Sequence, residues 1–457
     1  MFKFKVDLIR DKNILKALVL FAVPIFISNV FQQMYNTMDT MIIGNVLGDT
    51  SLAAIGACGA VYELLIGFAL GIGNGLSIVV ARSYGSKDER LLKKSVAGSL
   101  VIGAIVTVVI MIISGLFLYP LLELLNTPAN IINESYSYIS VITLFVGVMF
   151  AYNLFAGLLR AIGNSVMPLV FLIISSVINV VLDLIFITQF NMGIAGAAVA
   201  TVIAQGISAI LCLIYIIKKC PILIPSKECF KVEKDLYKEL AGQGLSMGLM
   251  LSIVSTGTVI LQTAINGLGY LTIAGHTAAR KLNSFCTMPV ATMSLALSTF
   301  VSQNKGAEKY ERIRKGVKVA NIMAICWGAI ITVALLFSAS TLVKVLSGST
   351  EPTVINNGAL YLIINAPFYA ILGMLLNLRN SLQGLGKKVV PLASSIIEFL
   401  GKCLFVALFI PSLKYLGVII CEPIIWCFML LQLSYSFYKN PLIQGYKNGL
   451  NTLEQVR

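Results

Sequence analysis

Five acidic side chains lie inside long apolar stretches of the sequence, where a charge has little water to solvate it. They are Asp39, Glu63, Asp183, Glu398 and Glu422. A charged side chain at the centre of a membrane helix costs at least about 2.5–3.5 kcal/mol, so each carboxylate needs a polar partner, a proton or a cation. Ionisable residues in this setting mark ion and substrate pathways, which makes all five candidates for a functional site.

Asp39 ends a polar stripe on an otherwise apolar stretch. Ser28, Gln32, Tyr35, Asn36 and Asp39 recur at spacings of three and four residues, which places them on one face of a helix. Such a face needs a water-filled cavity or polar partners. We therefore predict that Gln32, Tyr35 and Asn36 belong to the same polar site as Asp39.

Asp183 follows Asn179 by four residues, so both side chains lie on one face of a later helix. In the topology described below, Asp39, Asp183 and Thr201 lie in the outer half of the membrane, which allows one cluster. Two carboxylates in a poorly hydrated pocket favour a bound proton, and their oxygens, with those of Asn179 and Thr201, also suit Na⁺. The alternative is that the two acids are structural and held by hydrogen bonds.

The remaining buried charges are predicted to form a substrate site or a secondary polar site. Glu398 and Lys402 are four residues apart, which favours an ion pair within one helix. Arg280 and Lys281 have no acid at helical spacing, so we expect them to pair with Glu398 or Glu422 across helices.

Glu63 lies near the midplane of its predicted helix. Two interpretations stay open for it. It is either the acid that meets a cationic substrate or a neutral acid beside Arg280.

Membrane helices must position these side chains. The 457 residues are 58% hydrophobic and only 12% charged, with a mean hydropathy of +0.89, whereas a typical soluble domain is about 25% charged. A span needs roughly 20 apolar residues. We predict an all-α integral membrane protein with twelve transmembrane helices, at about 17–46, 51–81, 95–119, 135–159, 167–189, 194–217, 241–267, 271–301, 319–346, 355–378, 389–411 and 415–438.

Basic residues set the expected orientation. Of the 34 lysines and arginines, 29 lie in the termini and the even-numbered connections between spans. By the positive-inside rule, both termini are cytoplasmic. The net charge of +14 is therefore interpreted as a topology signal, and no aromatic residues alternate with the basic clusters as in nucleic-acid-binding proteins.

The two halves of the chain resemble each other. Residues 160–168 (RAIGNSVMP) match 383–391 (QGLGKKVVP), and 81–96 match 302–317, at displacements of 223 and 221 residues. Each half has an even number of spans, so the two six-helix lobes share one orientation, related by a pseudo-twofold axis with a central cleft. The predicted domains are an N-lobe (1–217), a cytoplasmic linker (218–240), a C-lobe (241–438) and a cytoplasmic tail (439–457).

The repeat does not duplicate the acid pair. The same displacement puts Lys402 opposite Asn179 and Glu422 opposite Thr201, while Asp183 has an apolar counterpart. We therefore expect ion coupling in the N-lobe and a weaker polar site in the C-lobe.

The sequence resembles the bacterial branch of the multidrug and toxic compound extrusion (MATE) family over essentially its whole length. The matching segments are VPIFISNVFQQMYNTMDTMIIGNVLG (23–48), GSKDERLLKK (85–94), LLRAIGNSVMP (158–168), NVVLDLIFI (179–187) and GIAGAAVAT (193–201).

This resemblance implies a V-shaped pair of lobes in the bacterial inner membrane. It also implies export of amphipathic, often cationic drugs in exchange for H⁺ or Na⁺, with the residues matching Asp39, Asn179, Asp183 and Thr201 as the cation site. The alternative function is a flippase for a lipid-linked or polysaccharide precursor, as in relatives with the same pseudo-symmetric core.

Several other functions are not supported by the sequence. It has one histidine and neither HExxH nor GxSxG, so we expect a transporter and not an enzyme. It has no GxxxxGK[ST] motif, so we expect no direct use of ATP. The expected partners are the lipid bilayer and small amphipathic molecules, with no cofactor beyond the coupling ion and no nucleic acid.

Overall fold

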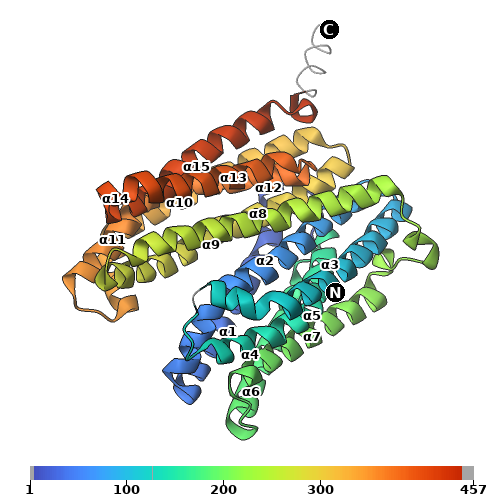
Figure 1. Cartoon of the computed structure of the whole chain (residues 1–457). Helices are drawn as coiled ribbons and strands as arrows, with labels where there is room; N and C mark the ends of the chain where they lie inside the picture. The colour runs from blue at the N-terminus through green and yellow to red at the C-terminus, as the bar shows by residue number, and fades with distance from the viewer. Residues whose placement is uncertain (1–4, 126, 445–457) are drawn as a thin grey trace. The chain divides into compact units, whose positions relative to one another are not determined.

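The computed structural model describes residues 5–125 and 127–444, and the regular structure in them is helical (Figure 1). The first part of the predicted tail is described, while 445–457 lie outside the described residues. The helices of the N-terminal half are α1 (Ile14–Leu47), α2 (Asp49–Gly85), α3 (Glu89–Leu124), α4 (Ile132–Leu144), α5 (Val146–Ala161), α6 (Val166–Leu184), the π-helical η1 (Ile185–Gln189) and α7 (Gly193–Lys219).

The C-terminal half repeats this succession of long helices after two short 3₁₀ turns, η2 (Pro221–Leu223) and η3 (Lys227–Phe230). Its elements are α8 (Lys234–Asn266), α9 (Tyr270–Gly306), α10 (Tyr310–Ser347), α11 (Pro352–Asn365), η4 (Ala366–Phe368), α12 (Tyr369–Gly384), α13 (Val389–Leu404), η5 (Phe405–Phe409), α14 (Ile410–Leu413) and α15 (Tyr415–Tyr438).

Twelve spans are confirmed. In the described part of the chain, eleven helices are long and apolar enough to cross a membrane, and α4 with α5, bent by 49° at Phe145, forms a twelfth. Several helices run past the predicted ends, as α2 and α9 do by reaching Gly85 and Gly306. Hydropathy falls where charged residues begin, but backbone hydrogen bonding continues, so apolar windows underestimate helix length.

The start of α8 lies inside the segment predicted to be a linker. Its first turn begins at Lys234, and ion pairs join this region to earlier helices: Arg82 of α2 pairs with Glu239, and Lys94 of α3 pairs with Glu233. The hydrogen bond from Lys94 lowers the pKa of the exposed Glu233 carboxyl below its usual value. The end of the segment is therefore helical and tied to α2 and α3.

The chain divides into two compact units. The first unit comprises the residues up to Asp7 and Leu20–Ser252, and the second comprises Leu8–Val19 and the residues from Ile253 onward. Helices α1 and α8 are therefore each shared between the two units.

The backbone confirms the internal repeat. Positive φ angles recur in pairs separated by 221 or 223 residues: Gly48 with Gly269, Lys87 with Glu308, Gly163 with Gly386, and Asn191 with Lys414. The single π-helical turns also correspond, because η1 ends the α6 span and η5 interrupts the α13 span. Turn geometry is thus duplicated even where side chains differ.

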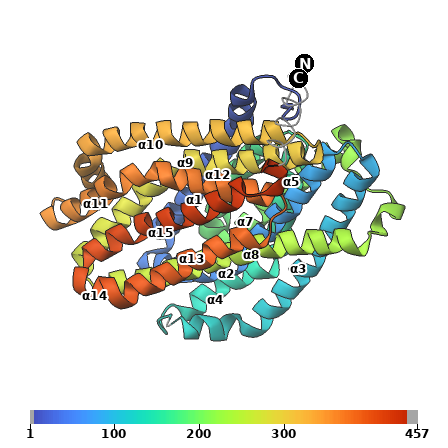
Figure 2. The ribbon, with the colours of Figure 1, turned by 90° about the horizontal axis from the view of Figure 1, so that it is seen from above.

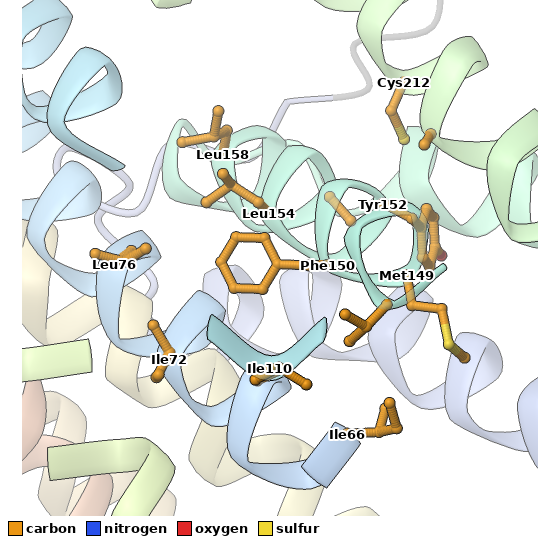
Figure 3. Packing of buried hydrophobic residues seen from close by; sticks show 14 of the residues in the cluster. Ile66, Ile72, Leu76, Ile110, Met149, Phe150, Tyr152, Leu154, Leu158 and Cys212 are labelled. Atoms are coloured by element: carbon orange, nitrogen blue, oxygen red, sulfur yellow. The ribbon is translucent and has the colours of Figure 1, made fainter. Parts of the chain in front are cut away.

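The core of the first unit holds the helices that carry its polar residues. Figure 3 shows the ring of Phe150 (α5) among Ile72 and Leu76 of α2 and Leu154 of α5, all of which are buried. Helix α7 packs against α5 and α6. This apolar packing fixes α2 and α7 relative to α5.

In the second unit, α12 contacts α9, α10 and α15, and α13 contacts α15 (Figure 2). The buried charged residues of this unit lie on α12, α13 and α15, and the half-buried Arg280 lies on α9. Helices distant in sequence therefore bring these charges together.

Candidate functional site

A polar cavity of about 340 Å³ lies in the first unit, among α1, α2, α4 and α7. We call it the acid cavity. The lining side chains able to form hydrogen bonds through oxygen or nitrogen are Tyr35, Asn36, Asp39, Thr40, Tyr62, Glu63, Tyr138 and Thr201.

Asp39 and Asp183 form a pair. Their carboxyl groups lie close enough for a side-chain interaction, although Asp183 is not itself part of the cavity lining. Asp183 is 1% exposed, and among the residues that the structure describes neither of its carboxylate oxygens has a hydrogen-bond donor; the same is true of Oδ1 of Asp39. Two ionised carboxylates offer only acceptors, so a proton or a cation is needed to join them.

Asn179 lies one turn before Asp183 on α6 and is also buried. Within residues 5–125 and 127–444, neither polar atom of its carboxamide has a hydrogen-bond partner. A buried polar atom without a partner costs about 1–3 kcal/mol, so a ligand that engages these atoms would be stabilised.

The predicted stripe on α1 is divided between two environments. Tyr35, Asn36 and Asp39 line the acid cavity, whereas Gln32 does not line it and instead interacts with the Tyr35 hydroxyl. Gln205 of α7, which sequence reasoning did not single out, donates to the same hydroxyl at 3.5 Å. Tyr35 is therefore held between α1 and α7.

Glu63 lines the acid cavity beside Tyr62. The alternative that Glu63 is a neutral acid beside Arg280 is not supported, because Arg280 bonds to Glu422 and Tyr361. Tyr62 was missed by the sequence interpretation. Its position next to Glu63 within an apolar helix could have identified it from the sequence.

A second set of charges forms a chain of ion pairs in the second unit. The Arg280 guanidinium donates to Glu422 at 2.7 Å, and Lys402 Nζ lies 3.6 Å from the other oxygen of Glu422. Lys402 also donates to Glu398 at 3.0 Å. The predicted pair Glu398–Lys402 is confirmed, and of the two partners left open for Arg280, Glu398 and Glu422, the structure shows Glu422.

Lys281 was expected to pair with Glu398 or Glu422, and that expectation was wrong. It is exposed and makes no ion pair within the described parts of the chain. Adjacent residues on a helix point in directions about 100° apart, so only one of Arg280 and Lys281 can face the acids.

The expected location of Arg379 was also wrong. The predicted span ended at residue 378, so Arg379 was counted with the cytoplasmic connection. It lies instead within α12, is 7% exposed, donates from Nε to Ser394 at 3.0 Å and lies 3.5 Å from Glu398. The polar run 377–384 resembles a loop in composition, but its side chains bond inside the unit, as Asn380 does to Ser294.

The acidic residues of the first unit could bind a small cation. No group of three or more His, Cys, Asp or Glu residues suited to a metal ion occurs among the described residues. The oxygen atoms of Asp39, Asp183 and Asn179 match a proton or a hard monovalent cation better than a transition metal.

Comparison with known proteins supports a transporter. The sequence model of the MatE family matches residues 24–185 and again 247–408, two matches that begin 223 residues apart. This spacing equals the repeat displacement found in the sequence. The family match therefore covers both halves of the chain.

Two curated relatives come from Bacillus subtilis (strain 168). Probable multidrug resistance protein YoeA is 28% identical over 93% of this chain and 94% of its own length, and probable multidrug resistance protein YpnP is 29% identical over 85% and 86%.

A crystal structure of MATE in the bent conformation has the same fold, with a TM-score of 0.86 at 20% identity over 96% of this chain and 98% of that one. The family match to both halves, the relatives and the shared fold agree. The chain belongs to the multidrug and toxic compound extrusion (MATE) family of multi-pass membrane transporters and is not an enzyme.

Proposed function

We propose that this chain is a secondary antiporter that exports amphipathic, often cationic compounds across a bacterial inner membrane in exchange for H⁺ or Na⁺. It works by alternating access, with both termini in the cytoplasm. The N-terminal lobe carries the coupling site, composed of Asp39, Asn179, Asp183 and Thr201. The names of the relatives as multidrug resistance proteins favour export over the flippase alternative.

The observation that carries this proposal is the pairing of Asp39 with Asp183 beside a polar cavity. Asp39 reaches both the cavity and the buried Asp183, whose oxygens have no hydrogen-bond partner. Asp39 therefore links the buried acid to a space large enough to admit water or ions. An inward cation gradient can load this pair, and release on the other side resets it.

The acid cavity also has the chemistry to recognise a cationic compound. Glu63 supplies a negative charge, and the rings of Tyr62 and Tyr138 line the same space. An aromatic face attracts a cation by about 0.5–2 kcal/mol, and more strongly where water is excluded. Substrate and coupling ion would then compete for one negatively charged cavity, which is the requirement for exchange.

Helix α1 is the element that connects ion binding to movement. It carries Asp39 and contains Pro24, whose ring removes one backbone hydrogen bond from the helix. Ser28 donates to the Pro24 carbonyl at 2.8 Å. Neutralising Asp39 would allow the outer part of α1 to repack by bending near Pro24.

The test is efflux of a fluorescent organic cation from proteoliposomes with an imposed pH gradient or, separately, an imposed Na⁺ gradient. Asp39→Asn and Asp183→Asn should reduce gradient-driven efflux to the level of protein-free vesicles, because neither carboxyl group can then exchange its cation. The gradient that drives wild-type efflux identifies the coupling ion.

The matched control is Asp235→Asn, an exposed acid in the first turn of α8, which should transport like the wild type. Full gradient-driven efflux by both Asp39→Asn and Asp183→Asn would refute coupling at this site.

A further inference from the structure

The buried charges of the second unit surround a cavity of about 220 Å³, which we call the ion-pair cavity. Its charged lining residues are Arg280, Arg379, Glu398, Lys402 and Glu422. Three of these side chains are cationic and two are anionic. The lining therefore carries one positive charge in excess.

The five charged side chains form a chain of neighbours, and the excess positive charge lies at the two ends of that chain. The sequence of neighbours is Arg280, Glu422, Lys402, Glu398 and Arg379, so cations and anions alternate and both ends are guanidinium groups. Lys402 in the middle has both carboxylates as neighbours and donates hydrogen bonds to Glu398 and Thr258. Each arginine, by contrast, has one carboxylate neighbour.

Arg379 has unused hydrogen-bonding capacity. Its Nη2 atom is buried and has no hydrogen-bond partner in the described part of the chain, although Nε donates to Ser394. The Glu398 carboxylate lies 3.5 Å from Nη2 but does not have hydrogen-bond geometry. It therefore stabilises the positive charge without accepting a hydrogen bond from this atom. A buried guanidinium with a free N–H edge is an expensive arrangement unless an acceptor enters the cavity.

We propose that the ion-pair cavity binds the carboxylate of an organic monoanion, with Arg379 as its main contact and Arg280 as a second contact. The carboxylate of the ligand would balance the one excess positive charge of the cavity. Bound to Arg379, it would add an anion at the end of the chain of alternating cations and anions. The planar guanidinium matches the two oxygens of a carboxylate. Arg280, whose side chain is 35% exposed, leaves a route by which the anion enters.

The rest of the lining determines the class of ligand. Val254, Leu372, Leu375, Leu376, Trp426 and Met429 provide apolar walls next to the charges. The unpartnered Oδ1 of Asn283 adds one hydrogen-bond acceptor. This combination selects an amphipathic carboxylate, since a small inorganic anion would leave the apolar walls without contacts.

Trp426 provides a direct binding signal. The sequence has two tryptophans, and Trp327→Phe leaves Trp426 as the only one. In that background, energy transfer from Trp426 to a dansyl group reports occupancy of the cavity. The full-length protein is titrated in detergent with dansylglycine, which has a carboxylate, with uncharged dansylamide, and with cationic dansylcadaverine.

We expect saturable energy transfer for dansylglycine and only the linear detergent background for the other two probes. Arg379→Met should weaken dansylglycine binding by about tenfold, the usual loss for one charge-assisted hydrogen bond. Arg379→Lys should restore part of the affinity, because it keeps the charge and loses the planar group. The control Arg90→Met, an exposed arginine on α3, should leave binding unchanged.

Equal binding of dansylglycine and dansylamide, or unchanged affinity in a monodisperse Arg379→Met protein, would overturn the proposal. Sodium acetate should displace dansylglycine better than sodium chloride at the same ionic strength; equal displacement would refute a carboxylate site. The assay uses no gradient and leaves Asp39 and Asp183 intact. Its outcome is therefore independent of the proposed coupling mechanism.

Discussion

The two units contain equivalent helices but treat buried charge in opposite ways. In the first unit, Asp39 and Asp183 interact with each other, and neither interacts with a lysine or arginine among the residues that the structure describes. In the second unit, Glu398 and Glu422 share Lys402 and are flanked by arginines. Lys402 stands at the position that corresponds to Asn179.

This difference indicates how one fold supports two kinds of site. The second unit has a covalently attached cation, which cannot leave, and so its acids are permanently neutralised. In the proposed mechanism, the acids of the first unit take a cation from solution, which can leave. The duplicated architecture would then combine one exchangeable site with one fixed network, and the two differ by a few substitutions on matching helices.

The sharpest way to test this contrast is to remove the fixed cation. Lys402→Met leaves Glu398 and Glu422 buried with less compensation, so we expect a destabilisation of about 3–5 kcal/mol. In the first unit, Asp183→Asn should cost little or increase stability, because a neutral amide replaces a buried carboxyl group that has no lysine or arginine to balance it. Thermal unfolding of the purified proteins, followed by size-exclusion chromatography, measures both.

Lys318→Met, at an exposed position on α10, is the matched control and should unfold like the wild type. If Lys402→Met and Asp183→Asn were equally stable, the proposed difference between the units would be wrong.

A second variant pair measures how tightly the fixed network is coupled. Glu398→Gln added to Lys402→Met should recover part of the lost stability, because it removes one of the two carboxylates left without their lysine. Residues in contact show coupling energies of about 0.5–3 kcal/mol in double-mutant cycles. Thermal unfolding of the two single variants and the double variant gives this energy, and strictly additive effects would contradict a shared network.

The smallest expected effect concerns the hydrogen bond between Gln205 and Tyr35. Its length of 3.5 Å is at the limit for such a bond, so Tyr35→Phe, which removes this bond and the interaction of the hydroxyl with Gln32, should cost no more than about 1.5 kcal/mol. The same thermal-unfolding assay tests this. A loss comparable to that of Lys402→Met would show that the polar residues of the first unit are as structural as those of the second.

Much of the fold could be predicted because the bilayer imposes a strong local constraint. Each span requires about 20 apolar residues, so hydropathy located all twelve. The repeat was visible in short motifs at the turns, and the positive φ angles at Gly163 and Gly386 show why these segments agree between halves. The pair Glu398–Lys402 was predictable because both residues lie on one helix.

Prediction failed where tertiary contacts decide the environment of a polar residue. Arg379 follows an apolar segment and looks like the start of a loop, but it lies inside the unit, where it donates from Nε to Ser394 and lies 3.5 Å from Glu398. Composition alone does not distinguish a polar residue that faces water from one that faces a buried partner. For the same reason, Lys281 was expected to pair when only its neighbour Arg280 does.

The sequence by itself determined the membrane class, the number of spans, the repeat and the acids worth testing, because these properties depend on composition and on spacing along one helix. Only the tertiary structure decided that α1, α2, α4 and α7 enclose one cavity, and that Asp39 meets Asp183 while Glu422 meets Arg280 and Lys402. The contacts Asp39–Asp183 and Arg280–Glu422 join residues more than a hundred positions apart, and Lys402 meets Glu422 from a different helix. All of them depend on helix packing, which no local pattern encodes.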